Sequence, residues 1–224
     1  SGATPDGVAI TVSSAKVIVT DVATLTVSGK LAIPRVTPAG AGATVRYSAL
    51  KMGDVVVSAS AVTGDFGLTG TISIKGLDTN DAAAGFTRLN WAKAFDLNGD
   101  GVKDLFNPGA ALPTPVDLTI DFPASLQLRV SGSVTGTSGA DLIFLQAGPV
   151  SLGGSAQFAV TRQTVDVDTD GNGTADLSGA TPDGVAITVS SAKVIVTDVA
   201  TLTVSGKLAI PRVTPAGAGA TVRY

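Results

Sequence analysis

The chain of 224 residues contains no histidine and no cysteine. Without imidazole or thiol groups it lacks their acid–base and nucleophilic chemistry, together with the usual ligands of zinc, haem and iron–sulfur clusters. Its serines likewise have no histidine to activate them. Disulfides cannot form, so a secreted protein of this kind needs another source of stabilisation. We therefore expect that the protein is not an enzyme.

Charged and aromatic residues are also scarce, at 15% and 4% of the chain. The formal net charge is −3 and no basic face is visible, which argues against nucleic acid as a partner. No apolar run reaches the roughly 18 residues that a membrane helix needs, so we expect no membrane insertion in this segment. Hydrophobic residues still make up 44%, enough for a core of valine, alanine, leucine and isoleucine.

One long stretch occurs twice. Residues 1–47 recur without a change as residues 178–224, an offset of 177 positions. This offset is close to the size of a domain and far above the roughly 20 to 50 residues of common solenoid repeats. We interpret residues 1–177 as one full repeat unit and residues 178–224 as the start of the next identical unit, in a window of a tandem array. An engineered duplication of 47 residues is the alternative explanation.

Short-range patterns indicate strands almost throughout. Residues 8–12, 15–19 and 23–27 alternate apolar with small polar side chains, and valine and threonine dominate them. The best helical candidate is residues 81–95, although Gly85 weakens it. Turn signals fall at residues 4–7, repeated at 181–184, at residues 107–115, and at residues 38–43, which we expect to form a loop within the fold.

Four glycines separate pairs of alternating runs. Gly29, Gly70, Gly132 and Gly154 lie 41, 62 and 22 residues apart, close to multiples of about 20, as stacked rungs with a glycine at each corner or bulge would give. A two-sheet sandwich whose hairpins share a turn type would give a similar spacing of glycines. The next step, from Gly154 to Gly206, is 52 residues and breaks the pattern of multiples of about 20. We predict an all-β, elongated repeat module, β-sandwich-like with acidic loops between strands, and a β-solenoid as the alternative.

The two acidic loops, residues 96–105 and 168–177, share the pattern D-x-(N/D)-x-(D/N)-G-x-x-D-L. Side chains at the first, third and fifth positions converge when the backbone curls, and glycine at the sixth permits the sharp turn of a calcium loop. To one calcium ion we assign Asp96, Asn98, Asp100, Asp104 and the carbonyl of Val102. To a second we assign Asp168, Asp170, Asn172, Asp176 and the carbonyl of Thr174, with Asp166 closing or flanking that shell.

Alternatives to these assignments exist. Acidic turns held by their own side-chain to backbone hydrogen bonds have the same composition. The glutamate of a helix–loop–helix calcium hand is missing at the twelfth position, where Asn107 and Gly179 stand, and the flanks resemble strands. A third group in residues 78–81 (Asp78, Asn80 and Asp81) is more typical of a solvated turn than of a site. The lone Trp91 is more typical of a core than of a sugar-binding surface.

The two loops resemble the calcium loops of dockerins, thrombospondin type 3 repeats and FG-GAP or VCBS repeats. Combined with long identical β-rich units, they make the chain similar to the giant repetitive adhesins of Gram-negative bacteria, of the RTX and biofilm-associated type. The resemblance implies a secreted filament that folds and stiffens in extracellular calcium. The adhesin repeats are usually shorter than this unit, and no GGxGxD array occurs here.

We accordingly expect a structural extender in a very large secreted or cell-surface bacterial protein, located extracellularly, with calcium as its cofactor. Its expected partners are neighbouring copies of the same repeat, with lateral self-association into fibres. The alternative function is a repeated adhesion module that binds glycans or proteins. That function would need an aromatic cluster on one face, whereas the ten aromatic residues are thinly spread along the sequence.

Overall fold

The computed structural model describes residues 3–19, 23–63, 66–137 and 139–217. Ten strands and two short 3₁₀ turns account for its regular structure. The strands are β1 (Ala3–Val19), β2 (Ala23–Pro38), β3 (Tyr47–Thr63), β4 (Phe66–Ala82), β5 (Leu126–Thr135), β6 (Ile143–Ala147), β7 (Val150–Gln163), β8 (Val165–Val167), β9 (Leu177–Val196) and β10 (Ala200–Thr214). The 3₁₀ turns are η1 (Trp91–Lys93) and η2 (Pro108–Ala111).

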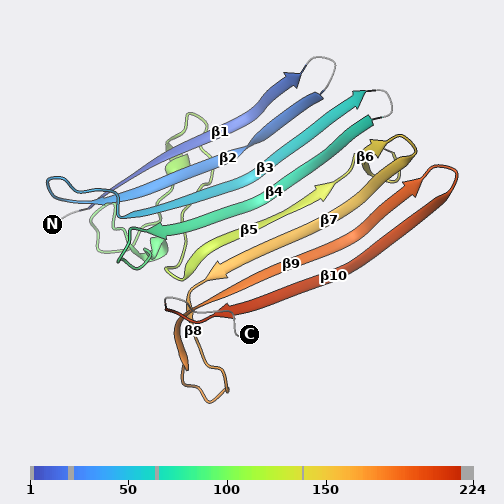
Figure 1. Cartoon of the computed structure of the whole chain (residues 1–224). Coiled ribbons are helices and arrows are strands. Elements are labelled where there is room, and N and C mark those ends of the chain that lie inside the picture. The colour runs from blue at the N-terminus through green and yellow to red at the C-terminus, as the bar shows by residue number, and fades with distance from the viewer. Residues whose placement is uncertain (1–2, 20–22, 64–65, 138, 218–224) are drawn as a thin grey trace.

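The strands form one antiparallel sheet in the order β1-β2-β3-β4-β5-β7-β9-β10, with β6 beside β4 and β7 and β8 beside β9 (Figure 1). The all-β prediction is confirmed. The two facing sheets of a sandwich and the stacked rungs of a solenoid are not found in the described residues, because consecutive long strands pair with each other along one open sheet. Hairpins between neighbours, more than repeated turns of a coil, therefore explain the spacing of the alternating runs.

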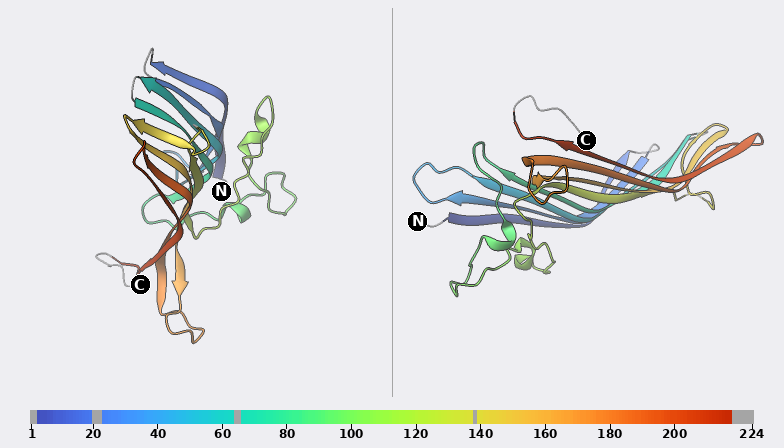
Figure 2. Two further views of the ribbon diagram at one scale, coloured as in Figure 1. Left: turned by 90° about the vertical axis from the view of Figure 1, so that its right-hand side faces the viewer. Right: turned by 90° about the horizontal axis from the view of Figure 1, so that it is seen from below.

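Glycines mark irregularities in this sheet. The register shifts beside Gly29 in the pairing of β2 with both of its neighbours, and beside Gly76 in the pairing of β4 with β5. Gly29 has a φ of 147°, and an added Cβ would lie 2.6 Å from Cγ2 of Val55. The expectation of a bulge thus holds at Gly29, and Figure 2 shows that the whole sheet bends along its strands. Gly70, by contrast, pairs regularly inside β4.

A second layer covers only one end of the sheet. Residues 83–125, which we call the loop layer, leave β4, lie against one face of the first strands and return into β5 (Figure 2). The core at this contact is formed by Ala32, Val36, Ala49, Trp91, Phe95, Leu118, Ile120, Phe122 and Leu126. Trp91 is fully buried, as expected of a core residue. The helix expected over residues 81–95 is wrong, since only η1 forms there and apolar contacts with the sheet shape the rest.

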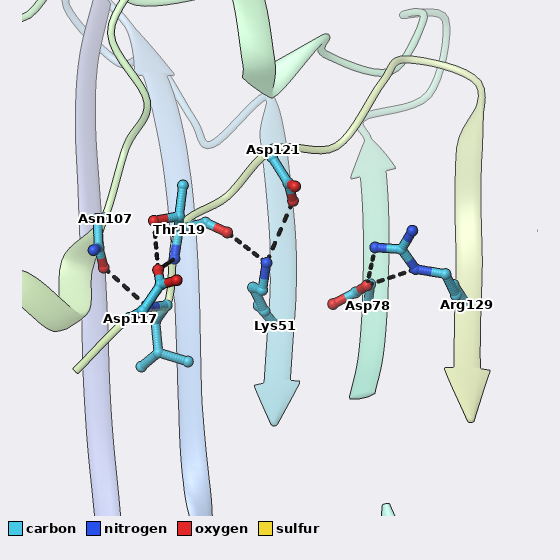
Figure 3. Close-up of polar contacts among 8 residues, drawn as sticks. Lys51, Asp78, Asn107, Asp117, Thr119, Asp121 and Arg129 are labelled. Atoms are coloured by element: carbon cyan, nitrogen blue, oxygen red, sulfur yellow. Dashed lines mark hydrogen bonds and ion pairs between the residues drawn. The ribbon is translucent and has the colours of Figure 1, made fainter. Parts of the chain in front are cut away.

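Buried polar groups fasten the loop layer to β4. Asn80 is fully buried, accepts a hydrogen bond from Nε1 of Trp91 at 2.9 Å, and donates to the carbonyls of Leu89 and Pro123. Asp78, 5% exposed, accepts two hydrogen bonds from Arg129 on β5 (Figure 3). The interpretation of residues 78–81 as a solvated turn is therefore wrong, because these residues lie inside β4 and have partners far away in sequence.

The turns expected at residues 4–7 and 181–184 are also replaced by strand. Both segments lie inside long strands, β1 and β9, where a neighbouring strand satisfies the backbone. Asp6 pairs with Arg35 and Asp183 with Arg162 across these ladders. The loop expected at residues 38–43 is confirmed between β2 and β3, and η2 with the residues after it accounts for the turn signal at 107–115.

Candidate metal centre

Two short loops carry the predicted calcium ligands. The first aspartate loop, residues 96–104, lies within the loop layer just after η1. The second aspartate loop, residues 168–176, connects β8 to β9 and projects away from the sheet (Figure 1). The structure thus places the second loop between strands, as expected, and the first in an irregular layer that packs on strands.

The backbone of the two loops is held by the same hydrogen bonds. In the first, both carboxylate oxygens of Asp96 accept from backbone amides, those of Gly99 at 2.7 Å and Gly101 at 2.9 Å. In the second, Asp168 accepts from Gly171 and Gly173, both at 2.7 Å. All four glycines have φ between 78° and 89°, a left-handed conformation that glycine adopts without a steric penalty. The shared pattern of glycine and aspartate in the sequence therefore produces a shared local fold.

The last aspartate closes each loop in the same way. Asp104 accepts a hydrogen bond from the amide of Leu97 at 2.7 Å, and Asp176 accepts one from the amide of Thr169 at 2.8 Å. At the neck, the amide of Asp104 donates to the carbonyl of Phe95, and the amide of Asp176 donates to that of Val167. The first and last positions are thereby brought together, although seven residues lie between them along the chain.

Three carboxylates converge in the second loop. Oxygens of Asp168, Asp170 and Asp176 lie within 4.8 Å of one another, a spacing that a single cation can bridge. The same three places in the first loop hold Asp96, Asn98 and Asp104, so an amide oxygen replaces one carboxylate there. Calcium accepts both kinds of oxygen.

The amide and the carboxylate side chains at the third and fifth positions are swapped between the two loops. In the first loop Asn98 donates to Asp100 at 3.1 Å, whereas in the second Asn172 donates to Asp170 at 2.9 Å. Each loop consequently carries three carboxylates and one amide at its four side-chain positions, and a formal charge of −3 on those positions. A divalent cation would offset most of that charge in either loop.

Hydrogen bonding lowers the pKa of two carboxyl groups in the second loop. The amide of Gly173 is the main cause that lowers the pKa of Asp168 below its ordinary value of 3.8. The hydroxyl of Thr169 is the main cause that lowers the pKa of Asp176. Both groups lie at the surface, so at neutral pH these carboxylates are charged and available to a cation.

The remaining predicted ligands occupy different positions. Asp166 on β8 accepts from the hydroxyl of Ser178 at 2.9 Å and the amide of Gly179 at 2.8 Å, both at the start of β9, so it flanks the second loop. The amides of Val102 and Thr174 donate to the fifth-position side chains, Asp100 and Asn172, at 2.8 Å in each loop. These bonds fix the backbone whose carbonyls are the expected further ligands.

The internal hydrogen bonds are also those of Asx turns, which hold such loops without a metal. A carboxylate oxygen that accepts one amide hydrogen retains a further lone pair, so the same geometry leaves capacity for a cation. The ligand set is made only of oxygen, which suits a hard cation such as calcium and not a soft one.

A second polar cluster lies where the loop layer crosses the sheet (Figure 3). Lys51 on β3 donates to the carbonyl of Thr119 at 2.6 Å and to Asp121 at 3.3 Å. Lys30 and Lys75 both pair with Asp54. Lys51 thus fastens the loop layer to β3, whereas Asp54 links β2, β3 and β4 within the sheet.

Comparisons with family models, with curated proteins and with solved structures find no match for this chain. Among the described residues, no helix is both long and apolar enough to cross a lipid bilayer.

Proposed function

We propose that the chain is a structural repeat of a very large secreted or cell-surface bacterial protein, in which it acts as an extender or filament-forming segment stiffened by calcium. One observation carries this proposal: identical hairpins occupy opposite ends of one open sheet. In β1–β2 and in β9–β10 equivalent residues pair, for example Val8 with Ile33 and Val185 with Ile210, and the bulge beside the central glycine recurs. An open sheet that carries the same hairpin at both ends can be extended by repetition, which favours length over catalysis.

Calcium enters the proposal through the two aspartate loops. Asp96, Asn98, Asp100 and Asp104 would hold one ion, and Asp168, Asp170, Asn172 and Asp176 the other. Bound calcium would relieve the repulsion between neighbouring carboxylates and, because an unfolded loop has no preformed site, would stabilise the folded state. In the first loop the ion would also rigidify the layer that covers the core.

An extracellular setting is part of the same proposal. Loops of this kind in extracellular modules bind calcium with dissociation constants of roughly 10⁻⁴ to 10⁻³ M, so they fill only where calcium is abundant. The chain has no cysteine with which to form disulfides. Calcium would therefore supply the stabilisation that disulfides give to many secreted domains.

Electron microscopy of the native protein in calcium-containing buffer tests the extender function. We expect rods or ribbons with a regular axial repeat, and less regular particles after chelation. Compact particles of constant size in both buffers would contradict the proposal and would favour a discrete binding module.

A further inference from the structure

The duplicated hairpin shows one sequence in two environments. β2 is hydrogen-bonded to β1 on one side and to β3 on the other. Its copy β10 is hydrogen-bonded to β9, and in the described part of the chain no strand lies on its outer side. Because β10 has the sequence of β2, the pairing of β2 with β3 shows which strand fits the open side of β10.

The same contrast holds for β1 and β9. β9 pairs on its second side with β7, from Val150 opposite Val196 to Arg162 opposite Asp183. β1, which has the same sequence over the duplicated residues, has no strand on that side among the described residues. For each edge strand, the identical copy elsewhere in the sheet shows which strand can pair with its open side. For β10 this strand is β3, and for β1 it is β7.

Side-chain burial points to the same missing neighbour. Ala32 and Val36 on β2 are 0% and 4% exposed beneath the loop layer, and Pro34 between them is also buried. Of their copies on β10, Ala209 and Pro211 are exposed and Val213 is half-buried, and the neighbouring Leu208 is 53% exposed. An exposed apolar strand with an open edge is a ready site for strand addition.

We propose that β9–β10 is a junction hairpin shared by two copies of the repeat. On one side β9 keeps its pairing with β7 of its own copy. On the other side β10 pairs with β3 of a second copy, in the register that β2 uses, and the second copy's loop layer covers the face around Ala209. The inference rests on the proposed extender function, because it specifies how consecutive units are joined.

Charge pairing supports this register. Lys30 on β2 forms an ion pair with Asp54 at 3.1 Å, so its copy Lys207 would meet Asp54 of the second copy. Asp183 on β9 already has two arginine partners, Arg162 from β7 at 2.5 Å and Arg212 from β10 at 3.7 Å. The ladder at a junction therefore places opposite charges beside each other.

A junction of this kind makes the sheet continuous from unit to unit. Six long strands (β1, β2, β3, β4, β5 and β7) precede the next copy of β1, and neighbouring strands lie about 4.8 Å apart, so each repeat advances the sheet by roughly 29 Å. Separate domains joined end to end would give a larger step. Separate chains can form the same junction if the β9–β10 hairpin of one replaces the identical β1–β2 hairpin of the other.

Disulfide trapping tests the junction in a chain that has no cysteine of its own. Thr24 faces Ser60 and Leu25 faces Ala59 in the β2–β3 ladder, so Thr201 and Leu202 are the corresponding positions on β10. Full-length chains carrying T201C and S60C are refolded together and oxidised, and a second mixture uses L202C with A59C. Two adjacent pairs are needed because close and wide pairs alternate along an antiparallel ladder.

The control mixture combines T201C with S48C, since Ser48 faces Arg35 near the far end of the ladder. We expect one of the matched mixtures to give at least about ten times more linked dimer of the two chains than this mismatch, because cysteines whose Cα atoms lie more than about 7 Å apart cannot bridge. Equal yields, or dimers of the T201C chain alone, would overturn the junction. Circular dichroism of each single variant verifies that it folds.

The junction and the extender function can fail separately. Rods in the electron microscope without matched cross-links would leave an extender whose units are joined in another way. Matched cross-links with compact particles would leave the strand pairing in place and remove the extender function.

Discussion

Aspartate side chains have three different roles in this chain, set by the groups around them. In the two loops the aspartates accept hydrogen bonds from backbone amides and lie close to one another, as Asp168 and Asp176 do. Asp78 is buried and is neutralised by Arg129, which removes the cost of an isolated buried charge. Asp54 lies at the surface between Lys30 and Lys75.

Only the first of these roles could be predicted from the sequence. The loop ligands lie within ten residues of one another, so their spacing alone indicates convergence. The partner of Asp78 is 51 residues away and the tryptophan that holds Asn80 is 11 residues away in an irregular segment. Local composition therefore indicated a turn where distant partners stabilise a buried strand.

Acid should weaken the fold through Asp54. Hydrogen bonds from Lys75 and then Lys30 lower the pKa of this carboxyl below 3.8. A lowered folded-state pKa means that the stabilisation is fully present above the unfolded-state pKa and is lost as the pH falls through the folded-state value. We expect D54N to cost at most about 1 kcal/mol at neutral pH, because the pair is exposed, and to flatten the acid side of the stability profile below about pH 4.

Denaturant unfolding at a series of pH values measures this effect, with D198N as the control. Asp54 and Asp198 both have a positive φ, of 49° and 59°, a conformation that asparagine also tolerates. Asp198 forms no ion pair among the described residues. If D54N and D198N had the same pH profile, the assigned role of Asp54 would be wrong.

The two copies of the hairpin show what the alternation of side chains in the sequence can predict about a pair of strands. Alternation of valine and threonine predicted strands at both copies, and the structure confirms them in one register with one bulge. The alternation does not predict which part of the sheet is covered. The loop layer covers it, and the residues of this layer that contact the sheet show no periodicity in the sequence. A sandwich-like arrangement was expected from hairpins that share a turn type, and a single partly covered sheet is found.

Identical sequences in two settings give a direct test of the bulge. G29A should destabilise the fold by about 1–3 kcal/mol, since the new Cβ would meet Val55 and the residue would keep an unfavourable φ. G206A, the same change in the second copy, should cost much less, because no atom lies within 4 Å of its added Cβ.

Denaturant midpoints of the two glycine variants provide the comparison. Equal losses would show that the backbone at this bulge, more than its contact with β3, determines the requirement for glycine. A larger loss for G206A would contradict the different environments that the structure gives to the two hairpins.

Considered as one object, the protein is a broad sheet with a small core at one end. Its long strands, such as the 17 residues of β3, span roughly 55 Å at about 3.3 Å per residue. The described core consists of the few residues beneath the loop layer, and many large apolar side chains elsewhere on the sheet are exposed. We therefore propose that this fold is stabilised by neighbouring copies and by an ion that rigidifies the loop layer.

Calcium-dependent stability is therefore the central claim, and differential scanning calorimetry of the full chain with calcium or with chelator tests it most directly. Calcium at about a hundred times its dissociation constant should add about 2.7 kcal/mol per site and raise the melting temperature. The rise should shrink in D168N and nearly vanish in the double variant D96N D168N. D166N should retain it, because Asp166 bonds to Ser178 and Gly179 outside the cluster. A melting temperature that calcium leaves unchanged, or an equal rise in the double variant, would contradict the account.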